Sequence, residues 1–237
     1  MSIGNANCLL CGAPIVYAED AQEFTCEVCG KAEMGHCACE NGHYVCDACH
    51  REKGVAFILD SCRASDTTNP IELAQQIMSD KSVYPNGPEH HTLVGAVLLT
   101  AYKNAGGDID LDAALAELQN RSLQVPGGTC GFWGTCGAAV SAGQYYSIIS
   151  GSTPMTQDPW AATARLTSNI IGRLADVGGP RCCKRTGFTA IEESARYTNE
   201  TMGTNMELPK RTVCTFMANN DECRKQDCPY FPKSVSL

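Results

Sequence analysis

Apolar positions after residue 50 recur at intervals of three and four, which is the period of an α-helix that buries one face. Alternation of apolar and polar residues, which is typical of strands, is missing from this part of the chain. Most of the periodic segments end at glycine, a common helix stop. The predicted helices are 51–65, 69–80, 88–107, 108–124, 135–151, 158–179 and 181–203. The pattern therefore predicts an all-α domain over residues 53–205.

Local signals refine three of these helices. Asn69 is suited to be an N-cap with Pro70 in the first turn, and residues 93–102 are apolar nearly all round, which predicts a central core helix. Aspartates in the first turn of the helix over 108–124 complement the helix dipole. Because this run lacks the later glycine and glutamate of a calcium loop, we expect Asp108, Asp110 and Asp112 to act in capping.

The first fifty residues have a different pattern, which is dominated by metal-ligand side chains. Two C-x-x-C-G turns are followed by a third group inside the run HCACENGHYVCDACH. Thiolates at i and i+3 across a tight turn can bind one cation, and zinc sites use such spacings. We predict a zinc module over residues 1–52 that holds two ions. Its ligands are Cys8, Cys11, Cys26, Cys29, Cys39, His43, Cys46 and Cys49.

The order in which these ligands share the two ions is open at this point. A sequential arrangement gives the two C-x-x-C turns to one zinc and the third group to the other, as in a zinc ribbon. A cross-braced arrangement pairs Cys8 and Cys11 with Cys39 and His43, and the remaining four with one another. Both satisfy tetrahedral coordination. His36, Cys37 and His50 are left as spare or supporting groups.

A disulfide scaffold is the other use of so many cysteines. The start MSIGNAN has neither a basic region nor an apolar one, so we expect no secretion signal and a cytoplasmic location, where thiols stay reduced. No stretch approaches eighteen uninterrupted apolar residues, which argues against a membrane span. A formal charge of −8 disfavours nucleic acid as the main partner.

A second set of cysteines lies at predicted helix boundaries. Cys130 and Cys136 lie in GGTCGFWGTCG, and Cys182 and Cys183 follow the glycines of GGPRCCKR. A helix N-terminus lowers a thiol pKa and favours an anionic cluster. We predict an iron–sulfur cluster here, of the 4Fe-4S type, with redox-active thiols and structural zinc as alternatives. The irregular tail over 206–237 adds three more cysteines, which suit an open-iron cluster or a third structural metal: Cys214, Cys223 and Cys228.

Other polar residues suggest supporting roles. Glu89 with His90 or His91 forms a candidate acid–base pair, and the alternative is capping by Glu89 beside two surface histidines. Arg181, Lys184 and Arg185 are placed to offset negative charge on a cluster or substrate. Phe132 and Trp133 are interpreted as a wall of the site or as core anchors. Cys62 is expected to be a small buried hydrophobe.

The motifs CENGHYVCDACH, PEHHTLVGAVLLTAYKNAGG, GGTCGFWGTCGAAVSAG, GGPRCCKR and the C-x8-C-x4-CPYFP tail together resemble a family of uncharacterised bacterial and archaeal proteins. That family occurs mainly in anaerobes, sometimes fused to or near a class I S-adenosylmethionine-dependent methyltransferase. The resemblance implies a partner such as a methyltransferase or redox enzyme. It implies no methyltransferase activity here, since a G-x-G-x-G fingerprint is missing. A weaker similarity links the chain to small redox proteins and to a helical domain associated with formylmethanofuran dehydrogenase.

These observations predict a metalloprotein with structural zinc and an iron–sulfur or redox-thiol site, acting in electron or sulfur transfer on a small or carrier-bound substrate. Catalytic candidates are Glu89, His90, His91, Arg181 and Lys184. The alternative is a non-catalytic zinc adaptor, or a protein that delivers a cluster to a partner enzyme, because closed four-ligand zinc sites are mostly structural.

Overall fold

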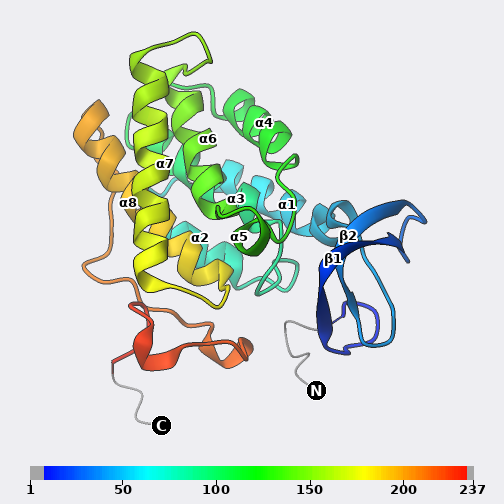
Figure 1. Cartoon of the computed structure of the whole chain (residues 1–237). Helices are drawn as coiled ribbons and strands as arrows, with labels where there is room; N and C mark the ends of the chain where they lie inside the picture. The colour runs from blue at the N-terminus through cyan, green and yellow to red at the C-terminus, as the bar shows by residue number, and fades with distance from the viewer. Residues whose placement is uncertain (1–7, 234–237) are drawn as a thin grey trace.

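The computed structural model describes residues 8–233, which form a two-stranded hairpin followed by eight α-helices and an irregular tail (Figure 1). The hairpin stands to one side of the helices, and the tail passes beneath the lower ends of α7 and α8. The elements are β1 Ile15–Thr25, β2 Ala32–Cys39, α1 Asp47–Ala64, α2 Pro70–Met78, α3 His90–Asn104, α4 Leu111–Ser122, α5 Thr129–Phe132, α6 Gly137–Ser150, α7 Asp158–Val177 and α8 Cys183–Met202, with 3-10 turns at Met217–Asn219 and Lys225–Asp227.

The predicted all-α domain is confirmed for the described residues after the hairpin. Asn69 caps α2 by accepting from the N–H groups of Ile71 and Glu72, and Asp110 caps α4 by accepting from Ala113. The first helix begins at Asp47, earlier than the predicted start at residue 51. The short α5 was not predicted, because four residues are too few to show a helical period.

α3 is the central helix of the core, as its apolar sequence predicts. Residues 90–102 are all buried, and the helix packs against α1, α2, α4, α6 and α8. Leu93, Leu98 and Leu99 are completely inaccessible to solvent. The close packing depends in part on Gly95, where an added Cβ would lie 2.6 Å from Leu118 Cδ1 of α4 and 3.0 Å from Ser141 Oγ of α6.

Substitution of Gly95 by valine is therefore expected to lower the free energy of unfolding by about 1–3 kcal/mol, since a branched side chain must push α4 or α6 away. Urea denaturation followed by circular dichroism measures this loss. The matched control is Gly172→Ala on exposed α7, where an added Cβ meets nothing within 4 Å. This control should be neutral or stabilising by up to about 1 kcal/mol. Equal denaturation midpoints for the two variants would contradict the packing argument.

α1 connects the hairpin to the helical domain without a flexible linker. Its first turn carries Cys49, and its later turns bury Ile58, Leu59 and Cys62 in the core. Cys62 is fully buried, and burial raises its pKa to about 12, so the prediction of a small hydrophobe is confirmed. The orientation of the hairpin is thus tied to the core through one continuous helix.

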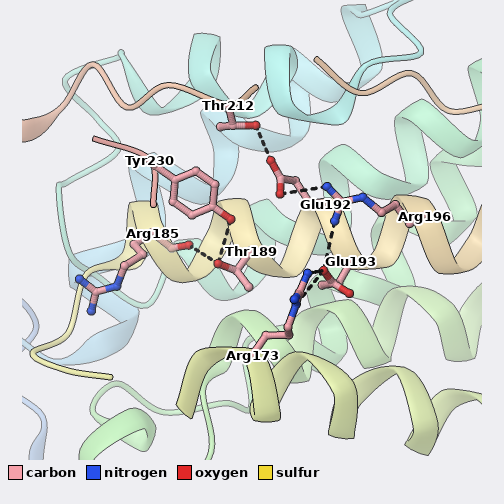
Figure 2. A network of polar contacts seen from close by, with 8 residues as sticks. All are labelled: Arg173, Arg185, Thr189, Glu192, Glu193, Arg196, Thr212 and Tyr230. Carbon is pink, nitrogen blue, oxygen red and sulfur yellow. Dashed lines mark hydrogen bonds and ion pairs between the residues drawn. The ribbon is translucent and has the colours of Figure 1, made fainter. Parts of the chain in front are cut away.

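The tail is fixed to the helical domain by side-chain and backbone contacts. Gln75 Nε2 donates to the carbonyl of Val213 at 2.8 Å, and Tyr230 belongs to the hydrophobic core. Figure 2 shows Thr212 and Tyr230 of the tail bonded to α8, through Glu192 at 2.5 Å and Thr189 at 3.0 Å. The tail therefore has a defined path across the start of α8.

Candidate metal centre

The two predicted metal sites are formed, and their wiring is cross-braced. Each group of four ligand atoms lies within 4.8 Å: Cys8, Cys11, Cys39 and His43 in the first site, Cys26, Cys29, Cys46 and Cys49 in the second. Cys11 Sγ and Cys39 Sγ are 3.8 Å apart, as are Cys29 Sγ and Cys46 Sγ. A tetrahedral zinc with Zn–S bonds of about 2.3 Å requires sulfurs about 3.8 Å apart. The geometry of both sites fits a metal ion.

The hairpin is the reason that the sequential arrangement does not form. β1 separates the two C-x-x-C turns, which lie before Ile15 and after Thr25. The register pairs Ile15 with Cys39 and Thr25 with Ala32, so the end of β2 returns to the first turn. The second turn is then completed by Cys46 and Cys49.

Backbone N–H groups donate to ligand sulfurs in both sites and so favour the anionic thiolate form. The N–H of His43 donates to Cys39 Sγ at 3.2 Å, and that of Cys46 donates to Cys26 Sγ at 3.3 Å. The Ala13 N–H and the Asn41 amide lower the pKa of Cys11 to about 6. Burial opposes ionisation of Cys26, but N–H donors outweigh it and lower its pKa to about 6 as well. Burial, together with neighbouring thiols, raises the pKa of Cys8, so a cation is needed to ionise the whole set.

A cavity of about 2050 Å³ lies between the hairpin, the helical domain and the tail. Of the sixteen cysteines, all of which lie in residues 8–233, seven serve the two metal sites and Cys62 is in the core. The other eight all line this cavity: Cys37, Cys130, Cys136, Cys182, Cys183, Cys214, Cys223 and Cys228. Thiols from the hairpin, from three helix starts and from the tail thus meet around one space.

A helix start was expected to lower the pKa of a thiol, and this expectation is wrong for Cys130 and Cys183. Burial is the main cause that raises the pKa of Cys130, and it raises that of Cys183 to about 12. The nearby thiol of Cys136 raises both further. α5, on which Cys130 lies, is only one turn long, so its dipole is small. At these two residues, burial and the negative charge of a neighbouring thiolate outweigh the effect of the helix ends on the pKa.

Aromatic residues form part of the cavity wall. Trp133 is 65% exposed and Phe132 is 45% exposed, so the interpretation of these residues as core anchors is wrong. Both line the cavity, and the Phe132 ring stacks on His36 of β2 with centroids 4.3 Å apart. This stack connects the hairpin to α5, which carries Cys130 and is followed by Cys136.

The three cations of the GGPRCCKR segment also line the cavity. Arg181 lies over the Tyr17 ring at 5.2 Å and 3.9 Å from a Glu222 carboxylate oxygen. Lys184 is buried, donates to the Tyr84 carbonyl at 3.1 Å, and has its pKa lowered by burial to about 8. Arg185 is buried and donates to the Gly178 carbonyl at 2.9 Å.

Glu89 is completely buried beneath the cavity, and its ionisable neighbour is His50, which sequence reasoning left as a spare or supporting group. Its Oε2 lies 3.4 Å from Nδ1 of His50, which lines the cavity from α1. Neither carboxylate oxygen has a hydrogen bond of good geometry among the described residues. Burial opposes ionisation, but contact with His50 and the charge of His90 outweigh it and lower the pKa of Glu89.

The two histidines after Glu89 are buried and point to different carbonyls. His90 Nε2 donates to Tyr84 at 2.9 Å, and His91 Nδ1 donates to Val125 at 3.1 Å. The alternative of capping by Glu89 beside surface histidines is therefore wrong, since the Glu89 side chain makes no cap hydrogen bond. The predicted acid–base role of these three residues stays a prediction.

Sequence reasoning also missed two polar groups beside the cavity, the buried Arg51 and the partly exposed Asp47. Arg51 of α1 donates to the Leu123 carbonyl at 2.5 Å, and Asp47 accepts from the Gly127 N–H at 2.5 Å. Both residues line the cavity and attach the start of α1 to the loop before α5. Their position directly beside the metal ligands Cys46 and Cys49 was the available signal.

The fold and the site together define a mainly helical protein with a cross-braced metal module and a cysteine-lined cavity. Residues 58–231 match the family of unknown function DUF5714, and the chain belongs to this family. No curated protein and no solved structure matches the chain. None of the helices in the described residues is long and apolar enough to cross a membrane.

Proposed function

We propose that the protein is a metalloprotein in which two structural zinc ions hold the hairpin and an iron–sulfur site in the cavity serves electron or sulfur transfer. Zinc suits the cross-braced sites because Cys₄ and Cys₃His sets with sulfurs about 3.8 Å apart are its preferred structural ligands. All four positions of each site are taken by protein, which agrees with a structural role. The substrate is proposed to be small or carrier-bound.

The observation that carries the proposal is the convergence of eight free cysteines on one cavity. Among residues 8–233, only the two cross-braced groups bring three or more ligand atoms within 4.8 Å. The cavity thiols are therefore too widely spaced for a single ion, whereas a multi-iron cluster is larger and binds thiolates further apart.

The surroundings of the cavity also suit a cluster. Iron–sulfur clusters bound by thiolates carry negative charge, and N–H donors to sulfur tune their potentials. Arg181, Lys184 and Arg185 supply positive charge at the wall. The volume of about 2050 Å³ exceeds the roughly 300–1,000 Å³ of ordinary ligand pockets, so a cluster leaves room for a substrate. A bound cluster would accept and release one electron at a time.

The test is the metal and acid-labile sulfide content of the full chain purified without oxygen, together with its visible and electron paramagnetic resonance spectra. We expect two zinc ions and, in addition, at least roughly four iron and four sulfide per chain. Zinc alone, with no iron or sulfide after anaerobic reconstitution, would overturn the proposal and favour the adaptor alternative. The expected partner, a methyltransferase or a redox enzyme, remains a prediction.

A further inference from the structure

Cys182 and Cys183 are neighbours in sequence, but their side chains face different surroundings at the start of α8. Cys182 Sγ accepts from the Asn220 side-chain amide of the tail at 3.4 Å and from the Arg185 N–H at 3.5 Å. The Cys183 N–H donates to Asn86 Oδ1 at 3.1 Å, and the N–H of Gly87 faces the Cys183 sulfur. One thiol is thus directed toward the tail and the other toward the loop before α3.

The three tail cysteines gather around Cys182. Asn220, whose side-chain amide donates to Cys182 Sγ, also accepts from the Cys223 N–H at 3.1 Å. Burial is the largest cause that raises the pKa of Cys214, and the nearby thiols of Cys182, Cys228 and Cys223 raise it further. Burial likewise raises the pKa of Cys228, with added contributions from Cys182 and Cys223. Backbone N–H groups already point at two of the sulfurs, from Phe216 to Cys214 and from Lys225 to Cys223, each at 3.4 Å.

The fold holds this group in place independently of any metal. The Cys214 N–H donates to the carbonyl of Tyr230 at 2.8 Å, so the two ends of the tail segment are paired. Tyr230 and Thr212 are in turn bonded to Thr189 and Glu192 on α8, as Figure 2 shows. Cys214 and Cys228 are therefore held beside the N-terminal half of the same helix that begins after Cys182.

Cys183 is grouped with a different set. The charges that raise its pKa, after burial, are those of Cys136, Glu89 and Cys182 in that order. Cys130 is influenced chiefly by burial and then by Cys136. Cys136 is the N-cap of α6, and an added Cβ on the next residue, Gly137, would lie 2.2 Å from Nε2 of His91 near the start of α3. Because the Cys183 N–H is bonded to Asn86 in the loop before α3, Cys136 and Cys183 lie near the same end of that helix.

We infer that the cavity holds two separate iron–sulfur sites: a four-thiolate site of Cys182, Cys214, Cys223 and Cys228, and a three-thiolate site of Cys130, Cys136 and Cys183. The inference rests on the proposed function and specifies its ligands. The first site has a thiolate for every iron of a four-iron cluster and suits electron transfer. The second leaves one iron without a protein thiolate, where a substrate with an oxygen, nitrogen or sulfur donor would bind.

Cys37 is left outside both sets. It lies across the cavity on β2. Burial raises its pKa, and the charged groups that add to or oppose this shift are Asp47 and Arg181 rather than other cysteines. The family match over residues 58–231 includes all seven assigned ligands and excludes Cys37. Cys37→Ser is therefore a matched control that removes a cavity thiol without removing a ligand.

The test compares Cys223→Ser and Cys130→Ser with Cys37→Ser and the unmodified chain, all full length and reconstituted anaerobically with iron and sulfide. The first two variants change thiols outside the core and should fold, which an unchanged zinc content and helical circular dichroism would verify. We expect each to lose about half of the iron and a different component of the electron paramagnetic resonance spectrum. Cys37→Ser should keep both components.

The adjacent pair gives the sharpest comparison, because Cys182→Ser should reproduce the Cys223→Ser spectrum and Cys183→Ser the Cys130→Ser spectrum. Loss of the same component in all four variants, with zinc and helicity retained, would overturn the two-site assignment but not the proposed function. Loss of iron in Cys37→Ser equal to that in Cys130→Ser would overturn the three-thiolate composition. Absence of iron from the unmodified chain would overturn the proposed function itself.

Discussion

Exchange of Cys39 for serine is expected to remove one of the two metal ions and to unfold the hairpin while the helical domain stays folded. Structural zinc binding contributes about 10–16 kcal/mol of apparent free energy, and in small modules this is folding energy. Cys39 is 4% exposed, so a serine there leaves a buried hydroxyl in place of a ligand. α3 keeps its own apolar contacts and has no need of the ion.

Native mass spectrometry measures the metal content, and hydrogen exchange compares β1 and β2 with α3. The matched control is Cys37→Ser, two residues earlier on the same strand and a ligand of neither site. This control should keep both ions and a protected hairpin. Retention of two ions in Cys39→Ser would contradict the assignment of Cys39 as a ligand.

The wiring can be read directly after substitution with cadmium-113. In the cross-braced arrangement, β-protons of Cys8 and Cys39 couple to one cadmium nucleus, and those of Cys26 and Cys46 couple to the other. The sequential arrangement would instead couple Cys8 and Cys26 to one nucleus. Coupling of Cys8 and Cys26 to one nucleus would contradict the cross-braced arrangement and the hairpin register that pairs Ile15 with Cys39.

Removal of the Glu89 carboxylate by Glu89→Ala is expected to lower the free energy of unfolding by about 3–5 kcal/mol, the cost of breaking a buried charge set. Glu89 is fully buried, and Arg51 and Lys184, which are 9% and 4% exposed, are among the cations that its charge stabilises. Without it, these two cations are left in a low-dielectric region with one fewer negative charge. Urea denaturation of the helical domain measures the loss.

Glu193→Ala on the outer face of α8 is the matched control. Glu193 pairs with Arg173 at 2.7 Å, but the arginine side chain is 59% exposed, so this ion pair contributes at most about 1 kcal/mol. A loss for Glu89→Ala no larger than that for the control would show that the carboxylate is protonated or solvated in the fold, and that it stabilises neither cation.

Much of the fold could be predicted from local chemistry. Asn69 and Asp110 start helices because their side chains accept backbone N–H groups, and this requires only neighbouring residues. α3 is central because its residues are apolar on every face, so no orientation leaves it at the surface. α5 was missed because a single turn has too few residues to show a period.

The ligand types of the metal module were also readable from spacing, but their pairing was not. Either wiring gives each ion four ligands, so coordination chemistry alone cannot choose. The choice follows from the register that sets Cys39 opposite Ile15, which is a property of the folded hairpin. In the same way, only the path of the tail shows which of the adjacent thiols of Cys182 and Cys183 faces Asn220.

The sequence by itself determined the helical class of the domain, its central helix and the eight ligands of the metal module, because caps, periodicity and C-x-x-C turns act over a few residues. Only the tertiary structure decided the cross-braced wiring, the cavity shared by eight thiols and the His50–Glu89 contact. Each of these depends on residues far apart in the chain, whose distances are set by the packing of α1, the hairpin and the tail around one core.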